Sequence, residues 1–461
     1  MYDQRIGVCW EPCKPDDVYN AIFNFNPING GTLDLIHGDI KNKQMFQNFL
    51  ERKNIILHGL FQNQYFTFFI SATITERLLD IYTTYRVDLT IEGVLTDTMD
   101  KFCSSVYKLQ IPYLESWINF TNCNIIKEYN KDFSQMKIKL PVKDSFFSTI
   151  NEDLIIEIHT YPNLNVRIEE SKLYRKAHLS LKFAKEKSFY EIKDMIYHLV
   201  DLLTLAINKP LYVESLKAKI NDKEVNFLFR RRFGLKNADD SFFYGGCLFR
   251  FIDIIEKSSL TKLLQNWFEN YENLKSVYRL FFLTYYSNDI LESKFLRLAQ
   301  ALDYFTNIYI SKNNISDKNI STYKFRRRKN KVINPLDCRI QKFYKKWLDK
   351  CLSNYLPFKK RIRVTAKNFS KIRQELKTFD NLINGIVEAR NDLSHGFIVD
   401  SNSENFYLKS YDDFIKLFYG LKLILTILLL DKLGFDDDAI LIFLKNECHY
   451  KAILENKYLY I

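Results

Sequence analysis

The apolar residues of this chain change their spacing partway along the sequence, and this change limits the fold more than any other feature. Between about residues 25 and 235, short runs alternate apolar and polar side chains, as half-buried β-strands do. From about residue 255, apolar residues recur every three or four positions, as in amphipathic α-helices. The sequence therefore predicts an α+β protein of two domains, with residues 1–240 β-rich and residues 241–461 all helical.

The N-terminal half contains many short strand-like runs separated by turn residues. Strands are expected within residues 54–75, 87–93, 133–140, 154–169, 177–183, 211–219 and 225–231, and one helix over residues 190–207. Such a series is typical of an antiparallel sandwich or a barrel. We take a sandwich-like domain as the expectation.

The C-terminal half predicts a bundle of long antiparallel helices. These are expected over residues 260–285, 291–311, 340–352, 369–395, 411–433 and 437–448. The longest apolar run, residues 423–430, is too short to cross a bilayer, which takes about 20 residues. The N-terminus also has no apolar stretch of signal-peptide length, so we expect a cytoplasmic protein with no membrane partner.

Positive charge is concentrated in a few segments. The net charge is +12, from 67 Lys and Arg against 55 Asp and Glu, which favours anionic partners such as nucleic acid. Two basic clusters lie in the helical half, at residues 324–331 and 359–363, and a solvated surface explains them as well as RNA contact does. The candidate RNA-binding residues are Arg326, Arg327, Arg328, Lys329, Lys331, Lys359, Lys360 and Arg361.

Cysteine usage gives only a weak indication of a metal. Eight cysteines in 461 residues are too few for a disulfide framework. Cys9 and Cys13 form one close pair, and Cys448 and His449 lie far along the chain. A zinc site from these four is an alternative to buried free thiols. The chain has no P-loop or dinucleotide fingerprint, so we expect no cofactor.

One segment, residues 388–396 (EARNDLSHG), carries residues suited to chemistry. The helix before it has apolar residues at steps of 4, 3, 4 and 3, and the same rhythm reaches position 390, which is Arg. A guanidinium on a core-facing stripe is costly unless it is paired or lines a site. The apolar residues of that stripe are Ile372, Leu376, Phe379, Ile383 and Ile386.

The same segment places a histidine at the end of its helix. Gly396 is a natural residue for ending the helix directly after His395. The negative end of the helix dipole favours the charged imidazole, so His395 is suited to take and give protons. Asn391 lies four residues earlier on the same face and can orient the ring. The alternative is a salt-bridged Arg390 with His395 as a helix cap.

R-N-D-L-S-H resembles the R-x4-6-H motif of HEPN ribonucleases, and the helix order around it is also similar. The whole layout resembles ApeA-type abortive-infection proteins, in which a β-rich domain precedes a HEPN domain. In that group an earlier helix carries an acidic residue within an FLxLxxALE-like stretch. Here the stretch reads FLRLAQALDYF and places Asp303 at that position, with Asp in place of Glu.

This resemblance implies a metal-independent endoribonuclease of antiphage defence. His395 would assist attack of the RNA 2′-OH on the adjacent phosphate, and Arg390 would stabilise the developing charge. Asn391 and Asp392 are second-rank candidates, and Asp303 is a further one. The resemblance also implies a homodimer through the HEPN domain, RNA and by analogy tRNA as substrate, and a phage-derived trigger. Two alternatives stay open, namely a non-catalytic RNA- or nucleotide-binding module and the toxin of a toxin–antitoxin pair.

Overall fold

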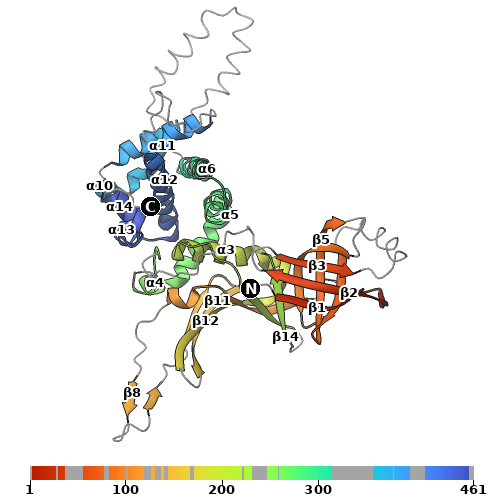
Figure 1. Cartoon of the computed structure of the whole chain (residues 1–461). Coiled ribbons are helices and arrows are strands. Elements are labelled where there is room, and N and C mark those ends of the chain that lie inside the picture. The colour runs from red at the N-terminus through yellow and green to blue at the C-terminus, as the bar shows by residue number, and fades with distance from the viewer. Residues whose placement is uncertain are drawn as a thin grey trace, which may run out of the picture. The chain divides into compact units, whose positions relative to one another are not determined.

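The computed structural model divides the chain into two compact units, each described here by itself (Figure 1). The β unit contains Met1–Asn273 and two short later segments, and the helical unit contains Asp289–Asp431, Phe435–Ile461 and Leu274–Thr284. The predicted boundary at residue 240 lies outside the described residues, and the β unit continues beyond it. The structure describes residues 3–26, 30–36, 55–76, 82–98, 102–118, 126–129, 136–139, 144–166, 171–220, 223–230, 247–257, 259–313, 357–376, 378–394 and 411–455.

Six antiparallel strands of the β unit close into a barrel. Their order is β6-β3-β2-β1-β4-β5, and β5 also pairs with β6, which joins the two ends of the series. Register shifts along β5 bend it enough to pair on both sides. Because β5 and β6 pair with each other, neither strand has an open edge where they meet. The strands are β1 (Asp3–Glu11), β2 (Lys14–Asn26), β3 (Gly30–Ile36), β4 (Ile55–Phe61), β5 (Gln64–Glu76) and β6 (Tyr82–Glu92).

Aromatic side chains pack the inside of the barrel. Alternate residues of β2 point inward, so that Phe23 is fully buried between its more exposed neighbours. Its ring lies 4.9 Å from that of Phe68, and the rings of Phe61 and Phe66 are 5.5 Å apart, centroid to centroid. Edge-to-face contacts of this kind add to the stabilisation that burial gives. The alternation of apolar and polar residues in the sequence thus marks the side chains that point into the barrel.

The sheet continues past β6 as an open antiparallel series, β14-β13-β7-β12-β11-β10. The α+β class and the order of the domains are confirmed, but a barrel extended by an open sheet replaces the expected sandwich-like packing. The cause is the double pairing of β5, which alternation within single strands does not encode. The added strands are β7 (Cys103–Gln110), β10 (Asp144–Thr149), β11 (Leu154–Val166), β12 (Ser171–Ser188), β13 (Ser215–Ile220) and β14 (Lys223–Phe229), with a separate hairpin of β8 (Ile126–Tyr129) and β9 (Met136–Lys139).

The helix expected over residues 190–207 is confirmed as α3 (Phe189–Ile207). The Glu191 carboxylate accepts a hydrogen bond of 2.7 Å from the backbone N–H of Ser188, which fixes the start of the helix. Asn208 adopts a left-handed conformation with φ of 57° and ends it. The β unit also holds α2 (Leu114–Ile118) and α4 (Phe251–Lys257).

The helical unit contains several of the expected long helices. Those predicted over residues 260–285, 291–311 and 411–433 are confirmed, and the one over residues 340–352 lies outside the described residues. No helix within the described residues is long and apolar enough to cross a membrane. The helices are α5 (Leu260–Tyr286, which begins in the β unit), α6 (Leu291–Lys312), α9 (Phe358–Thr365), α10 (Ser370–Glu375), α11 (Phe379–Ser394), α12 (Tyr411–Leu433), α13 (Asp437–Asn446) and α14 (Cys448–Leu454), with a 3-10 turn at Ala366–Asn368.

Two predicted helices are each interrupted. The helix expected over residues 369–395 is wrong as a single element, because the backbone leaves helical geometry at Leu376, with ψ of 70°, and α11 begins at Phe379. Leu376 and Phe379 are both buried, so apolar spacing continues across the break and hides it. The helix expected over residues 437–448 likewise ends at Asn446, and α14 begins two residues later.

Close packing fixes α11 against α12. A side chain at Gly420 of α12 would meet Leu382 at 2.4 Å, and one at Gly385 of α11 would meet Leu417 at 2.7 Å. Each glycine therefore makes room for a leucine of the opposite helix. This contact gives α11, which carries Arg390, a defined position on the apolar helix α12.

Candidate active site

Arg390 lies beside the apolar stripe of α11 and not in its centre. Three turns of 3.6 residues from Phe379 end between positions 389 and 390. Ala389 is accordingly 1% exposed, whereas Arg390 is half-buried at the edge of the stripe. The prediction of a fully core-facing Arg390 is therefore corrected, and the small Ala389 occupies the core position.

The side chain of Arg390 is supported by an aromatic ring from another helix. Its guanidinium carbon lies 5.3 Å from the centre of the Phe358 ring, at the start of α9. A nitrogen of the same guanidinium donates to the Asn391 carboxamide oxygen at 3.3 Å. A cation over an aromatic face gains about 0.5–2 kcal/mol, depending on its exposure. The contact orients the guanidinium and leaves further N–H groups for an anionic ligand.

A second arginine contacts the same ring. The guanidinium carbon of Arg361 lies 5.9 Å from the centre of the Phe358 ring. Arg361 is 5% exposed, forms an ion pair with Asp303 and donates a hydrogen bond to Asn307, both on α6. Phe358 thus connects Arg390 to a buried polar group, and α6, α9 and α11 pack together around it.

These contacts bear on two of the predicted roles. Arg361 was expected to contact RNA, but its burial and its partners on α6 fit a role inside the helical unit. Asp303 was a further catalytic candidate by resemblance to the family, and the structure shows it paired with Arg361. The predicted catalytic role of Asp303 is not tested by this pairing, which gives that carboxylate a packing function of its own.

The remaining predicted residues are only partly described. Asn391 is exposed and Asp392 is half-buried on the last turn of α11, and Lys359 and Lys360 are half-buried on α9. The hydroxyl of Ser394 donates to the carbonyl oxygen of Arg390 at 2.6 Å and closes that turn. His395, the residue after α11, lies outside the described residues, as do Arg326, Arg327, Arg328, Lys329 and Lys331.

Sequence reasoning missed Phe358. The sequence places it directly after Pro357, and proline is common where a helix begins. Phe358, Ile362 and Thr365 then follow at steps of 4 and 3, and all three are buried in α9. The basic residues of this segment hid that short amphipathic pattern, and it was interpreted as a charge cluster.

Of the four residues considered for zinc, Cys9 and Cys13 lie in the β unit and the other two in the helical unit. Cys9 is fully buried inside the barrel, and burial raises the pKa of its thiol well above the usual value. Cys13 is exposed. Cys448 and His449 belong to the helical unit, where Glu447 joins them in a compact group.

Comparison with known families matches both units. The family model for ApeA N-terminal domain 1 matches residues 4–267, and the model for Apea-like HEPN matches residues 296–439. No curated protein and no solved structure matches the chain. The second range contains Asp303, Phe358, Arg361 and Arg390, so the network described above lies within the HEPN match.

Proposed function

Because this chain belongs to the ApeA family, in which a dedicated N-terminal domain precedes a HEPN domain, we propose that it is a metal-independent RNA endonuclease of antiphage defence. The pair of domains fits an antiphage-defence protein, and HEPN domains are commonly nucleases. The RNA substrate, the reaction and the roles of Arg390 and His395 are what we add.

One observation carries this proposal, namely that an arginine is positioned on an aromatic ring one turn before the end of α11. The half-buried guanidinium of Arg390 faces Phe358, and His395 directly follows the last residue of the helix. The guanidinium of an arginine can bind a phosphate through two parallel N–H groups. An arginine with a purely structural role would not need to keep these groups available. The placement supports a phosphate-binding site at this end of α11.

The proposed reaction is an internal transesterification. His395 removes the proton from the ribose 2′-OH, and the 2′ oxygen attacks the adjacent phosphorus. The bond from phosphorus to the 5′ oxygen breaks, and that oxygen takes up a proton. The products are a 2′,3′-cyclic phosphate and a 5′-OH end. Arg390 stabilises the negative charge that develops on the phosphorane oxygens. DNA is spared because it has no 2′-OH.

Several parts of the assembly are proposed by analogy with the family. Two copies would join through the HEPN domain, so that two motifs face one cleft. The β unit would sense a phage-derived trigger or restrain the nuclease, and structured RNA such as tRNA would be the target. The cytoplasm is the compartment in which this activity would act.

The direct test is cleavage of total cellular RNA by the purified full chain in EDTA, with the product ends mapped. We expect cyclic-phosphate ends from the wild type and a loss of at least about 100-fold for His395→Ala, because general acid–base groups contribute about 10²–10⁴. Far-ultraviolet circular dichroism checks that the variant folds. Undiminished cleavage by His395→Ala would remove His395 from the mechanism.

RNA binding tests the basic surface of α9. Replacing Lys359 and Lys360 together with alanine should weaken binding and flatten its salt dependence. The slope of log Kobs against log salt should fall by up to about 1.4, since each phosphate contact on single strands contributes about 0.7. Lys371→Ala is the control, because Lys371 is an exposed lysine of α10 that pairs with Asp438. An equal effect of both changes would argue against a dedicated RNA surface.

The two alternatives predict different results. A non-catalytic binding module would keep its RNA affinity in His395→Ala and lose affinity with salt or on replacement of Arg326, Arg327 and Arg328. The toxin of a toxin–antitoxin pair would cleave RNA only until a partner protein is added, and an antitoxin gene beside its own would favour that assignment.

A further inference from the structure

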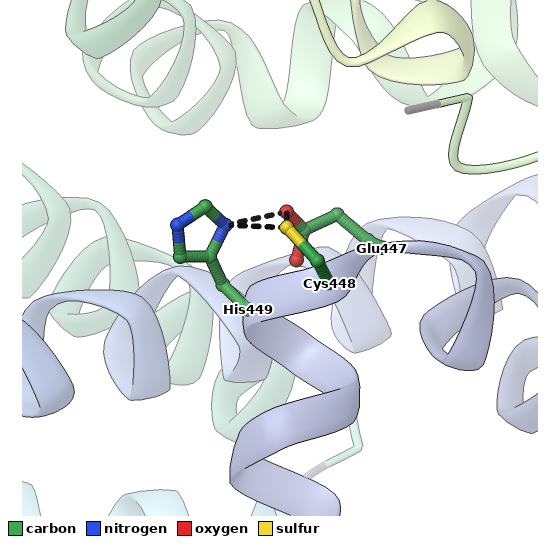
Figure 2. A group of neighbouring side chains, drawn as sticks. All are labelled: Glu447, Cys448 and His449. Carbon is green, nitrogen blue, oxygen red and sulfur yellow. Dashed lines mark hydrogen bonds and ion pairs between the residues drawn. The ribbon is translucent and has the colours of Figure 1, made fainter. Parts of the chain in front are cut away.

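Three consecutive side chains converge where α13 ends and α14 begins. Figure 2 shows the carboxylate of Glu447, the thiol of Cys448 and the imidazole of His449 turned toward one another. The Nδ1 atom of His449 lies 2.8 Å from Oε1 of Glu447 and 3.3 Å from Sγ of Cys448. The third distance, from Sγ to Oε1, is 3.7 Å. Within the described residues, no other three side chains that could bind a metal lie this close together.

The break between two helices produces this convergence. Three consecutive residues inside a helix point about 100° apart from one to the next, so their side chains spread over more than half a turn. Glu447 instead has an extended backbone, with ψ of 126°, and caps α14. Its Oε2 accepts from the backbone N–H of Tyr450 at 2.7 Å, so its side chain lies across the first turn and presents Oε1 to the other two.

Packing holds the group in place before any ligand binds. Glu447 is 6% exposed, and the ring of His449 stacks on that of Tyr419 in α12, with 4.0 Å between centroids and 7° between planes. Burial would raise the pKa of Glu447, but hydrogen bonds from His449 and from the Tyr450 backbone outweigh it and lower that pKa. The exposed Cys448 leaves a path from solvent. Burial and the Glu447 charge raise the pKa of its thiol, so a metal has to displace that proton.

The donor set selects the metal. Hard cations such as Mg²⁺ and Ca²⁺ take oxygen ligands, whereas sulfur with imidazole suits Zn²⁺. Tetrahedral zinc with bonds of about 2.0–2.3 Å needs its ligand atoms about 3.3–3.8 Å apart. The two distances to sulfur, 3.3 and 3.7 Å, lie within this range, and only the 2.8 Å distance between Glu447 and His449 has to widen.

We propose that Glu447, Cys448 and His449 bind one zinc ion, with water as the fourth ligand. On binding, the thiol loses its proton to solvent and the sulfur bonds to the metal. The ion connects the start of α14 to α12 through the stacked His449. The positive charge of Lys422 in α12 also acts on Glu447 and opposes a cation there. Zinc should therefore bind this site more weakly than it binds closed four-ligand sites. This site uses neither Arg390 nor His395 and does not depend on the proposed nuclease activity.

The test uses the full chain, freed of metal and titrated with Co²⁺, which replaces zinc and gives an absorption band when bound to a thiolate. We expect a band that saturates at one equivalent and disappears on adding Zn²⁺. Cys448→Ser should lack the band, and His449→Gln should weaken Co²⁺ binding by about tenfold or more. The control is Cys13→Ser, since Cys13 is an exposed thiol 3.5 Å from the Glu11 carboxylate with the same kind of neighbour, and this variant should keep the band.

Two results would overturn the proposal. One is the absence of a thiolate band in the wild type, which would leave Glu447 as a helix cap paired with His449. The other is a band that persists in Cys448→Ser, which would place the metal on other cysteines. Thermal melts of the metal-free proteins check that the variants fold, and Zn²⁺ should raise the melting temperature of the wild type but not of Cys448→Ser.

Discussion

Replacing Arg390 with alanine is expected to lower RNA cleavage by about 10²–10³-fold, the usual cost of removing one donor to a developing oxyanion. The half-buried side chain rests on Phe358 at the edge of α11, so its loss should cost little stability. Arg390→Lys should not restore activity, because an ammonium cannot present the two-pronged fork. Single-turnover cleavage of the RNA identified for the wild type measures both variants.

Arg373→Ala provides a matched control for this change. The guanidinium carbon of Arg373 in α10 also lies 5.3 Å from the centre of an aromatic ring, that of Phe379, and Arg373 is likewise half-buried. Arg373→Ala therefore removes a cation–π contact of the same kind but leaves the motif from Arg390 to His395 unchanged. RNA cleavage should be retained. Equal losses in Arg373→Ala and Arg390→Ala would show that the effect comes from packing and not from phosphate binding.

Replacing Asp303 with alanine is expected to destabilise the helical unit by about 2–4 kcal/mol. Removing one partner leaves the Arg361 guanidinium buried without its carboxylate, which costs about 3–5 kcal/mol for a fully buried pair. The expected value is lower because the Asp303 side chain is 28% exposed. Chemical denaturation followed by circular dichroism measures the change.

Asp380→Ala is the control for the ion pair. Asp380 of α11 pairs with Arg363 of α9, but both side chains are exposed, so its loss should cost less than about 1 kcal/mol. The double change of Asp303→Ala with Arg361→Met should recover part of the stability, since no buried charge is then left over. A folded, stable Asp303→Ala protein that no longer cleaves RNA would instead support the catalytic role that the family resemblance implies.

The sequence determined the class of the fold and supplied the candidate residues of the proposed site. Apolar spacing placed α3, α6 and α12 within a few residues of their observed ends, because helix periodicity and caps are local properties. Arg390, His395 and the FLRLAQALDYF stretch pointed to a HEPN domain, and the family match over residues 296–439 includes both residues and all of the stretch except Phe295. Local pattern was enough for these features.

Other features depended on contacts between distant segments. Alternation within single strands is the same in a sandwich and a barrel, so only the pairing of β5 with both β4 and β6 decided between them. The break at Leu376 was hidden because apolar spacing continues across it.

The surroundings of the proposed active site were decided in the same way. Arg361 belonged to a basic cluster in the sequence, and burial against α6 made it the partner of Asp303. Phe358 gained its role only when α9 and α11 packed together, because a cation–π contact depends on which face of the ring the fold presents. Sequence therefore named the residues suited to the chemistry, and tertiary packing decided which neighbours hold them.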